Sequence, residues 1–478
     1  MTREMGPTEF RAHGHAVIER IARYLERPEA FDVLPAIRPG AVKSALPAEA
    51  PEEPEPFDRI LDDYDRLILP ATTHWNHPGF FAYFGITGSG PGILGEALAA
   101  ALNVNAMLWR SGPAQTELEE VTLGWLRRLL GLPDSFFGVI NDTASSSTFY
   151  ALAAAREALG LGIRERGLAG RPELPALRVY CSEDAHSSVD KAVIALGLGA
   201  DNLVRLPTDR EFRLDPDALR AAVAEDQARG FLPMAVVATV GTTGVTAVDP
   251  VPAIADLCQR EGLWLHVDAA YAGSAAILPE LRQVLDGCDR ADSLVVNPHK
   301  WLFTPIDCSA AYTRHPHVMR QAFSLTPEYL ATPESDVTNL MDYGVSLGRR
   351  FRSLKLWFVL RYFGRAGIVE ALREHLRLAN LFAGWVRDHP GFVLAAPVHF
   401  SVVTFRYEPS GSRTAPELDE LNGSILDRVN ASGEVFLSHT RVRGRYTIRL
   451  AIGNLRTTEE HVTRAWALLC EAAAEADR

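Results

Sequence analysis

The sequence predicts an α/β fold in which helices cover both faces of a mostly parallel sheet. Between residues 91 and 303, short apolar runs rich in β-branched residues alternate with longer segments of helical periodicity. This alternation is typical of parallel sheets that are buried on both sides. The chain of 478 residues, 47% hydrophobic and 23% charged, is also large enough to bury an extensive core and to form two or more subdomains.

The expected strands are the five apolar runs at residues 137–140, 177–181, 234–240, 263–267 and 293–296. The intervening segments, such as 148–161 and 252–261, have the pattern and length of helices. Ligands of such sheets bind beyond the carboxyl ends of the strands. Most of the candidate functional residues follow one of these strands directly, so we expect the site at that edge of the sheet.

The N-terminal part, residues 1–90, is expected to be a helical arm. An amphipathic helix at 10–26 is followed by a connector rich in proline and glutamate at 47–56 and by another helix at 57–69. Such an arm cannot bury its apolar stripe alone. We therefore expect it to pack on a second subunit as a dimerisation segment.

The rest of the chain is expected to form two domains. Residues 91–355 form the large domain that contains the parallel sheet. Residues 356–478 form a smaller C-terminal α+β domain, with helices at 356–362 and 370–388 and strands at 399–407 and 446–452.

Charge and composition exclude several classes of partner. The net charge of −12 makes nucleic acid and anionic membrane surfaces poor partners. No apolar run approaches the ~18 residues that a membrane span needs, and the N-terminus lacks the apolar core of a signal peptide. The five cysteines are scattered without metal-ligand spacing, so we expect reduced thiols, no metal site and a soluble, cytoplasmic protein.

Lys300 is the most informative residue of the chain. It follows the expected strand 293–296 and precedes Trp301, Leu302 and Phe303. Apolar surroundings disfavour the ammonium form and lower the pKa, which makes the amine available as a nucleophile. The carboxylate of Asp268 follows the expected strand 263–267 in the same way.

An amine and a carboxylate at the ends of neighbouring strands are what pyridoxal phosphate requires. The lysine forms the Schiff base, and the carboxylate keeps the pyridine nitrogen protonated. Alone, Asp268 would more often be a turn or helix-capping residue. The small residues Ala269 and Ala270 after it leave room for a flat ring, which favours the functional interpretation.

Three further strand ends carry polar residues, each with an ordinary structural alternative. Residues 141–147 could serve as a helix N-cap, as a phosphate site, or as both. His186 follows the strand 177–181; a lone histidine is more often structural, but its polar neighbours here fit a stacking or acid–base role. The segment 241–244 could be a simple turn, or Thr243 could donate a hydroxyl to the cofactor.

Two segments give no clear assignment from their residues alone. The patch of Trp75, Phe80, Phe81, Tyr83 and Phe84 could be core or an aromatic-lined pocket, and the sequence slightly favours core. Tyr329 lies in the segment 323–343, which by composition is an ordinary surface loop.

Together these motifs resemble the group II pyridoxal-phosphate decarboxylases, and most closely the aromatic L-amino-acid decarboxylases. The resemblance extends over almost the whole chain. Its motifs are Thr73-His74-Trp75, Phe80 to Phe84, Asp184 to Ser188, His266 to Gly273, Asn297 to Leu302 and Leu347 to Trp357. The resemblance implies an aspartate aminotransferase-like fold of fold type I, a pyridoxal 5′-phosphate cofactor, and a homodimer with active sites at the subunit interface.

The resemblance also implies a role for individual residues. Lys300 is similar to the Schiff-base lysine and Asp268 to the partner of the pyridine nitrogen, while His186 stacks on the cofactor ring and Ala270 lies beneath its other face. The phosphate-binding positions of the family are matched by Thr143, Ala144, Ser145, Asn297 and His299. The residue near the phenolic oxygen is matched by Thr243. The substrate pocket is matched by Trp75, Tyr83, Phe84 and Ile86, together with Met107 and Leu108 from the second subunit. Tyr329 is similar to the tyrosine of a mobile catalytic loop, which protonates the substrate carbon after carbon dioxide leaves.

The resemblance implies a carboxy-lyase that converts an L-amino acid into its amine. Relatives that make aldehydes carry phenylalanine in place of the loop tyrosine or asparagine in place of the stacking histidine, so Tyr329 and His186 favour simple decarboxylation. Ile86, where catechol-processing animal members carry threonine, favours phenylalanine, tryptophan or tyrosine over dopa. The aromatic pocket shows no evident cation, so acidic substrates are not expected. An aldehyde synthase and a decarboxylase of branched aliphatic amino acids remain the alternatives.

Overall fold

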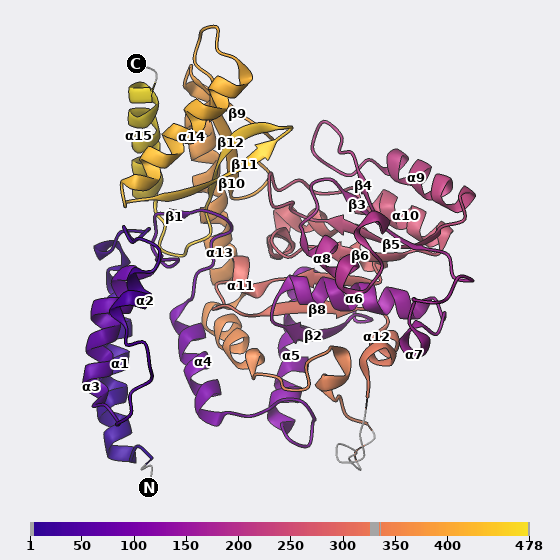
Figure 1. Cartoon of the computed structure of the whole chain (residues 1–478), viewed down its shortest axis with the longest axis horizontal. Coiled ribbons are helices and arrows are strands. Elements are labelled where there is room, and N and C mark those ends of the chain that lie inside the picture. The colour runs from indigo at the N-terminus through magenta and orange to yellow at the C-terminus, as the bar shows by residue number, and fades with distance from the viewer. Residues whose placement is uncertain (1–3, 326–333, 335, 477–478) are drawn as a thin grey trace.

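The computed structural model describes residues 4–325, 334 and 336–476. Its larger sheet has seven strands in the order β2-β8-β7-β6-β5-β3-β4 (Figure 1). All neighbouring strands are parallel except for β8, which is antiparallel to both β2 and β7. The strands are β2 (Phe137–Asn141), β3 (Leu177–Ser182), β4 (Leu203–Leu206), β5 (Leu232–Thr239), β6 (Trp264–Asp268), β7 (Ser293–Val296) and β8 (Ser309–Thr313). The mostly parallel sheet and its five expected strands are confirmed; β4 and β8 were not predicted.

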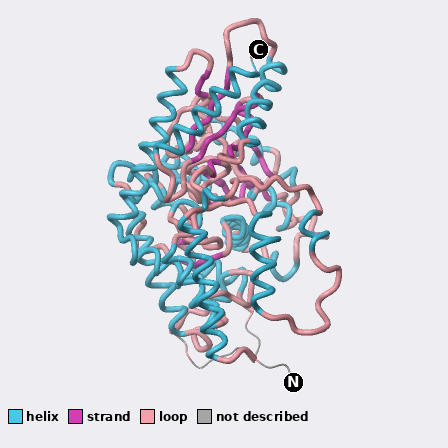
Figure 2. Tube along the Cα trace, turned by 90° about the vertical axis from the view of Figure 1, so that its left-hand side faces the viewer, coloured by secondary structure: helices cyan, strands magenta, loops and turns pink. Residues whose placement is uncertain are grey.

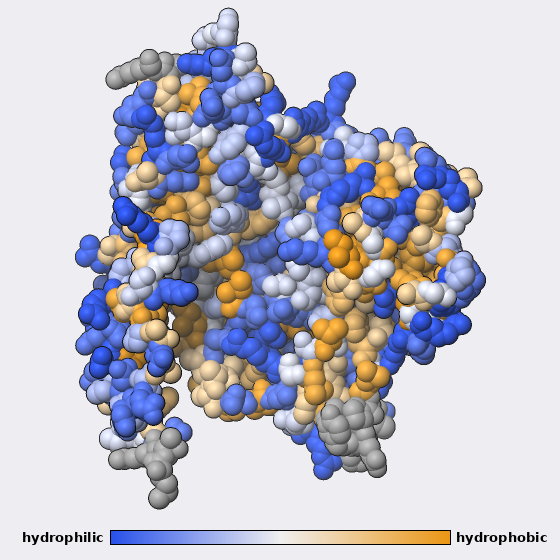
Figure 3. Space-filling model, viewed as in Figure 1, coloured by the Kyte–Doolittle hydropathy of each residue, from blue (hydrophilic) through white to orange (hydrophobic). Residues whose placement is uncertain are grey.

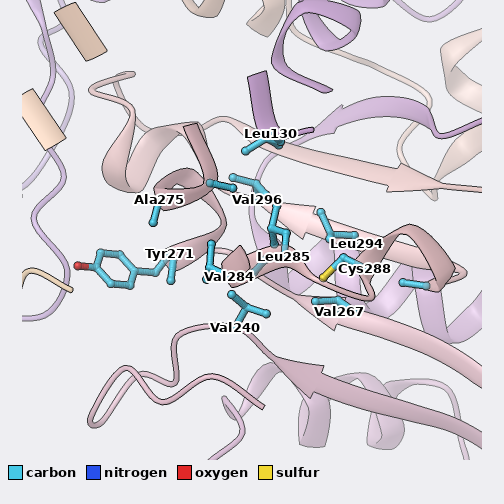
Figure 4. Packing of buried hydrophobic residues seen from close by; sticks show 14 of the residues in the cluster. Leu130, Val240, Val267, Tyr271, Ala275, Val284, Leu285, Cys288, Leu294 and Val296 are labelled. Atoms are coloured by element: carbon cyan, nitrogen blue, oxygen red, sulfur yellow. The ribbon is translucent and has the colours of Figure 1, made fainter. Parts of the chain in front are cut away.

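Helices cover both faces of this sheet because neighbouring strand residues point in opposite directions. Val236 of β5 packs into one apolar cluster, with residues of α5 (Pro113–Leu130), α9 (Pro216–Ala228) and α10 (Val251–Glu261). Val237 packs into the cluster on the other face, and this second cluster contains residues of α6 (Ala144–Ala158), α8 (Ser188–Ala195) and α12 (Pro316–Phe323). Figure 4 shows the first cluster from close by, with β-branched side chains of β6 and β7 at its centre.

A second sheet has five strands in the order β1-β11-β12-β10-β9 and lies mainly in residues 356–478, the segment that the sequence predicts as a small domain. Its strands are β1 (Phe80–Phe81), β9 (Phe392–Leu394), β10 (Val402–Tyr407), β11 (Phe436–Val442) and β12 (Arg445–Ala451). Residues of α14 (Ala415–Ala431) and α15 (Glu459–Ala476) pack on it. The strand β1 belongs to the N-terminal segment, and it pairs with β11 in parallel.

Two boundaries in the small domain differ from the prediction. The two expected helices, at 356–362 and 370–388, are both present within α13 (Arg352–Asp388), but each begins earlier than predicted, because α13 consists of two helices joined across a kink at Gly364 (φ 58°, ψ 178°). Positive φ is favourable for glycine, so the chain ends the first helix and changes direction there. The expected strand at 399–407 begins only at Val402.

The N-terminal arm projects beside the rest of the molecule (Figures 1 and 2). It contains α1 (Pro7–Glu26), α2 (Ala41–Ala45) and α3 (Phe57–Asp63). The regular helix expected at 57–69 ends at Asp63 and continues as a π-helical turn, Tyr64–Ile68. The α1 helix has no buried residue. No helix in the described ranges is both long and apolar enough to cross a membrane.

The helix α4 (Gly90–Leu102) follows the arm and leaves an apolar stripe uncovered. Leu94, Leu98 and Leu102 recur at every fourth position, and each is between 51% and 58% exposed. Figure 3 shows apolar surface in the region between the arm and α4. Residues on one face of a helix at this spacing normally contact another element, so this stripe lacks a partner within the described chain.

Candidate active site

Lys300 and Asp268 meet at the carboxyl edge of the large sheet, as the sequence predicts. Asp268 is the last residue of β6, and its Cα lies opposite that of Val295 in β7. The short helix α11 (Pro298–Trp301) begins two residues after β7 and carries Lys300. Burial lowers the pKa of the Lys300 amine, and the negative charge of Asp268 acts in the opposite direction. The amine is therefore held near a carboxylate in surroundings that favour its neutral form.

The imidazole of His186 has a fixed orientation. Its Nδ1 accepts a hydrogen bond from the Ser188 backbone N–H at 3.1 Å and lies 2.9 Å from the Ser188 hydroxyl. Burial lowers the pKa of His186, although Asp268 raises it. A neutral ring with Nδ1 as acceptor carries its proton on Nε2. The ring is thus held in one tautomer within electrostatic reach of both Asp268 and Lys300.

The N-terminus of α6 fits an anion. Thr143 is its N-cap, and the Thr143 hydroxyl accepts a hydrogen bond from the Ser146 N–H. The N–H groups of Ala144 and Ser145 belong to the first helical turn, which has no intrahelical acceptors for them. Ala144 packs with Ala270 and Val295 in one small apolar cluster. The helix terminus therefore lies beside the loop that follows Asp268, and its dipole favours negative charge there.

Asn297 and His299 flank the lysine from its own segment. The buried Oδ1 of Asn297 has no hydrogen-bond partner among the described residues. The Nδ1 of His299 accepts a hydrogen bond from the Cys308 N–H at 2.9 Å. Burial, reinforced by the charge of Lys300, lowers the pKa of His299 to about 4. A buried polar atom without a partner normally marks the place of a missing ligand or water.

The end of β5 completes the edge of the site. Gly241 has a φ of 90°, and a Cβ atom there would lie 2.5 Å from the Cβ of Ala272. Thr242 is buried and accepts a hydrogen bond from the Ala247 N–H, whereas Thr243 is exposed. The turn thus has a structural function, and Thr243 lies in the loop that follows β5, whose last residue, Thr239, is paired with Asp268.

The predicted aromatic patch is divided between core and pocket. Phe80 and Phe81 are buried, as the sequence favoured. Phe84 is also buried, yet its ring centre lies 4.8 Å from the Lys300 Nζ. Trp75 and Tyr83 are partly exposed and stack on each other with ring centres 5.6 Å apart. Phe84 is therefore the aromatic residue that the fold brings to the lysine, and Ile86 lies two residues beyond it.

Two further residues that the resemblance assigns to the pocket lie elsewhere in the fold. Met107 and Leu108 pack against Met341 in a separate small cluster, and the Met107 carbonyl accepts a hydrogen bond from the Met341 N–H. None of the contacts found in the described residues joins them to Phe84 or Lys300. Tyr329, the loop residue of the resemblance, lies outside the described residues.

Arg449 is a site residue that the sequence reasoning missed. Its side chain on β12 is 3% exposed, and its guanidinium carbon lies 4.7 Å from the centre of the Phe84 ring. One of its N–H groups donates to the Tyr83 carbonyl, while Nε and Nη2 have no partner among the described residues. Burial lowers the pKa of Arg449 to about 10. The expectation that no cation lies near the aromatic pocket is wrong.

A signal for Arg449 was present in the sequence. The strand Ile448 to Ile452 is apolar apart from this one arginine. Ile448 and Leu450 pack in the core of the small domain, so Arg449, between them, must point to the other face of the sheet. That face meets the large domain, and this meeting could be known only from the fold.

The Lys300 surroundings fit pyridoxal phosphate. They combine an amine that burial keeps reactive, a carboxylate on the adjacent strand, a helix N-terminus suited to a phosphate, and the partnerless Asn297 Oδ1. Strand residues pack alternately into the apolar clusters on the two faces of the sheet, and this packing fixes the strand ends that carry these groups.

Comparison with known proteins agrees with this geometry. The family model "Pyridoxal-dependent decarboxylase conserved domain" matches residues 39–408. An aromatic-L-amino-acid decarboxylase of Catharanthus roseus is 39% identical over 96% of this chain and 93% of that protein. A phenylacetaldehyde synthase of a Rosa hybrid cultivar is also 39% identical, over 98% of this chain and 94% of that protein.

Solved structures give the same result. An Oryza sativa protein named TDC, solved with PLP and tryptamine, superposes with a TM-score of 0.95, 37% sequence identity and 99% coverage of both chains. The tryptophan decarboxylase of Catharanthus roseus in complex with L-tryptophan gives a TM-score of 0.93 at 37% identity, over 99% of this chain and 100% of that one. On this evidence the chain belongs to the family of pyridoxal-dependent decarboxylases and is a carboxy-lyase that uses pyridoxal 5′-phosphate.

Proposed function

We propose that this enzyme removes the carboxylate of an aromatic L-amino acid, giving carbon dioxide and the corresponding amine. The observation that carries the proposal is the Phe84 ring, whose centre lies 4.8 Å from the Lys300 Nζ. An aromatic ring beside the reactive amine provides an apolar surface for a substrate ring. Relatives named as tryptophan and tyrosine decarboxylases, each 40% identical to this chain, support this substrate class.

The residues of the site are proposed to share the reaction as follows. When bound, pyridoxal phosphate supplies an electron-accepting ring that takes up the bonding electrons of the departing carboxylate. Lys300 would anchor the cofactor, Asp268 would keep its pyridine nitrogen protonated, and His186 and Ala270 would hold the ring between them. The phosphate would be held by Thr143, Ala144, Ser145, Asn297 and His299, and the phenolic oxygen by Thr243.

Proton supply distinguishes the amine-forming reaction from its main competitor. Tyr329 is proposed to donate a proton to the substrate carbon once carbon dioxide has left. If that proton arrives late, oxygen can react first and the product becomes an aldehyde. Two relatives that are 39% and 40% identical to this chain are named phenylacetaldehyde synthase, so aldehyde formation is the second candidate function. Tyr329 and His186 favour the amine.

The working form is proposed to be a cytoplasmic homodimer, in which the arm of residues 1–90 packs on the other subunit. The uncovered stripe of α4 and the exposed Ile18 and Ile60 of the arm support this assembly. It would bring Met107 and Leu108 to the substrate pocket from the second subunit. Residues 91–355 and 356–478 are proposed as the large and small domains.

A substrate panel tests the proposed function. The purified chain with pyridoxal phosphate is given phenylalanine, tryptophan, tyrosine, dopa, leucine or glutamate, and carbon dioxide, amine, aldehyde and oxygen uptake are measured together. We expect aromatic amines without oxygen uptake. Faster release of carbon dioxide from leucine or glutamate would refute the aromatic substrate class. Stoichiometric oxygen uptake with aldehyde formation would instead establish the aldehyde synthase.

A further inference from the structure

Arg449 is a buried cation that pairs with no carboxylate of the residues described. No ion pair of Arg449 occurs among the described residues, and two of its nitrogen atoms lack hydrogen-bond partners there. The contrast with Arg406 on the adjacent strand β10 is clear, because that equally buried arginine pairs with Asp419 at 2.9 Å and with Glu408 at 3.0 Å. Burying an unpaired charge is costly. An arginine held in this way has an electrostatic effect on whatever lies near it.

Lys300 is a titratable cation close to Arg449. Both groups approach the same ring, with the Lys300 Nζ 4.8 Å and the Arg449 guanidinium carbon 4.7 Å from the centre of Phe84. Tyr271 stacks on Phe84 at 4.1 Å and limits the access of water to the ring. Two positive charges in such apolar surroundings repel each other. A lysine ammonium binds its proton less tightly than an arginine guanidinium does. The repulsion therefore favours loss of the proton from Lys300.

We propose that Arg449 is a positioning residue that acts through Lys300, because its buried positive charge holds the lysine amine in the neutral, nucleophilic form. This inference rests on the assignment of Lys300 as the cofactor anchor in the proposed function. It gives a function to an arginine that pairs with no carboxylate in the described structure. It also explains why the arginine lies on the face of β12 that meets the large domain.

The other groups that face Lys300 have opposing or minor effects. Asp268, from the end of β6, attracts the ammonium form and so opposes Arg449. His186, which follows β3, and His299, which precedes Lys300 in α11, both have pKa values that burial lowers, so their rings are neutral near pH 7. Burial itself has the largest effect on Lys300. Arg449 thus adds a repulsion that offsets the attraction of Asp268.

The size of the effect follows from the distances. The two cationic groups are at most about 10 Å apart, and across that distance at an effective dielectric constant of about 20, one unit charge moves a neighbour's titration by about one pH unit. Removing the charge of Arg449 should therefore raise the midpoint of the Lys300 titration by about that amount. At any pH where the ammonium form predominates, the fraction of neutral amine would then be about tenfold smaller.

The composition of the chain makes this measurement direct. The sequence contains only four lysines, Lys43, Lys191, Lys300 and Lys355. In the full-length, cofactor-free protein labelled with ¹³C-lysine, each Cε resonance can be followed by NMR across a pH titration. The Lys300 signal is assigned as the one that disappears in Lys300→Ala. Lys43 and Lys191, which are exposed, serve as internal references.

Three variants separate charge from structure. We expect Arg449→Met to raise the Lys300 midpoint by about one unit, and Arg449→Lys to restore it to within a few tenths. Arg441→Met removes a charge from an exposed residue of β11 in the same sheet, and it should leave the midpoint unchanged. An unchanged midpoint in Arg449→Met, or an equal rise in Arg449→Lys, would overturn the proposal.

Other outcomes are also decisive. If Arg449→Met does not fold, Arg449→Gln provides a neutral polar replacement for the same titration. A lowered melting temperature with no titration shift would show that Arg449 merely supports the Tyr83 carbonyl, and this would refute the electrostatic role. If Lys300→Ala still bound pyridoxal phosphate covalently, the proposed function would fail. The effect of the Arg449 variants on the Lys300 titration midpoint would still be measurable, so the two failures can be told apart.

Discussion

Lys300 lies between an anion and a cation that act on its charge in opposite directions. Asp268 stabilises the ammonium form, whereas Arg449 and burial destabilise it. Burial and Arg449 lower the pKa of the amine, and Asp268 raises it, so the three effects together set how much of the amine is neutral. At the residue scale, the reactivity of the site therefore depends on three side chains that come from β6, α11 and β12.

Replacing Lys300 by alanine tests its role as the anchor. We expect Lys300→Ala to lose the visible absorbance that the wild-type chain gains with pyridoxal phosphate, because no amine remains at the site to bind it covalently. Turnover should fall by at least about 10²–10⁴-fold, the contribution of a positioned proton-transfer group. Spectra of the dialysed proteins and amine assays measure both. Lys191→Ala, an exposed lysine, is the matched control, and persistent absorbance in Lys300→Ala would contradict the assignment.

The role of Tyr329 can be tested through the product. Tyr329→Phe should convert the amine product into aldehyde, hydrogen peroxide and ammonia, because without its proton donor the substrate carbon reacts with oxygen. An oxygen electrode and product mass analysis measure the change. If the amine yield stays the same and oxygen uptake does not rise, Tyr329 is not the proton donor.

The positions of site residues are predictable from the sequence where a polar side chain closely follows an apolar strand. Lys300 and Asp268 were recognisable in this way. Arg449 was not, because a sequence does not say what the second face of a small-domain strand will meet. Phe84 was weighed as core or pocket, but it is buried and also faces the lysine. The role of Tyr329 was visible only through the family resemblance.

At the scale of elements, the turn after β5 is tightly constrained by the strand beside it. The Val240 N–H donates to the Asp268 carbonyl at 2.9 Å. The next residue, Gly241, has a φ of 90° and faces the Cβ of Ala272. Any side chain there would strain the backbone and collide with the segment that follows Asp268.

Gly241→Ala should therefore destabilise the protein by about 1–3 kcal/mol, the combined range for backbone strain and overpacking. Urea unfolding at pH 7 measures the change. Gly244→Ala in the same turn is the matched control, because its φ is not positive and its new Cβ would come no closer than 3.7 Å to another residue. We expect it to stay within about 0.5 kcal/mol of wild type. Equal stability of the two variants would contradict the packing argument.

One strand that the sequence does not reveal, β8, has a clear physical explanation. Strand β8 reads Ser-Ala-Ala-Tyr-Thr, and it lacks the β-branched apolar residues that mark its neighbours. It is nevertheless a strand because β2 and β7 pair with it on either side. Pairing of this kind depends on the whole sheet. The five predicted strands were recognisable because each is itself apolar enough to be buried.

At the scale of the whole molecule, a column of aromatic rings beside the site is hydrogen-bonded to residues of the C-terminal segment 356–478. Phe84 stacks on Tyr271 at 4.1 Å, and Tyr271 stacks on Trp301 at 4.8 Å. The Tyr271 hydroxyl lies 2.7 Å from the Ser401 hydroxyl, and the Trp301 Nε1 donates to His375 at 3.0 Å. In Figure 4 the Tyr271 ring extends away from the cluster of the large domain. The residue after Lys300 is thus fixed to the small domain.

Buried histidines should make the whole fold sensitive to acid. Burial lowers the pKa values of His266, His299 and His375 to about 4. Because these values lie below the unfolded value of about 6.5, the unfolded chain binds more protons between the two pH values, and stability falls as pH falls through this window. Burial raises the pKa of Asp249 to about 6, so this group has the opposite effect on stability. It involves one proton, whereas the three histidines together involve three.

Each histidine contributes a slope of about 1.4 kcal/mol per pH unit inside that window. Urea midpoints of the cofactor-free protein at pH 7.5, 6 and 5 should therefore decrease steadily. His375→Gln keeps a neutral polar group beside Trp301, and it should show a shallower decrease. A midpoint that is constant from pH 7.5 to 5 would show that these histidines are not buried in the neutral form.

The apolar stripe of α4 makes a prediction about assembly. Leu94, Leu98 and Leu102 are more than half exposed in the single chain, and burying each one further can contribute at most about 1.5–3 kcal/mol. Leu98→Glu would place a charge at the centre of the stripe and should convert the proposed homodimer into monomers. Activity should be lost together with the dimer, because Met107 and Leu108 would no longer reach a pocket of the second subunit.

Light scattering during size-exclusion chromatography gives the mass, and the amine assay on the same fractions gives the activity. Ile194→Glu is the matched control, because Ile194 is equally exposed (57%) but lies on α8, which covers the large sheet. We expect this variant to remain dimeric and active. A dimeric Leu98→Glu variant would show that α4 is not in the interface. A monomeric variant with full activity would show that the site is complete within one chain, and Met107 and Leu108 would then lose their proposed role.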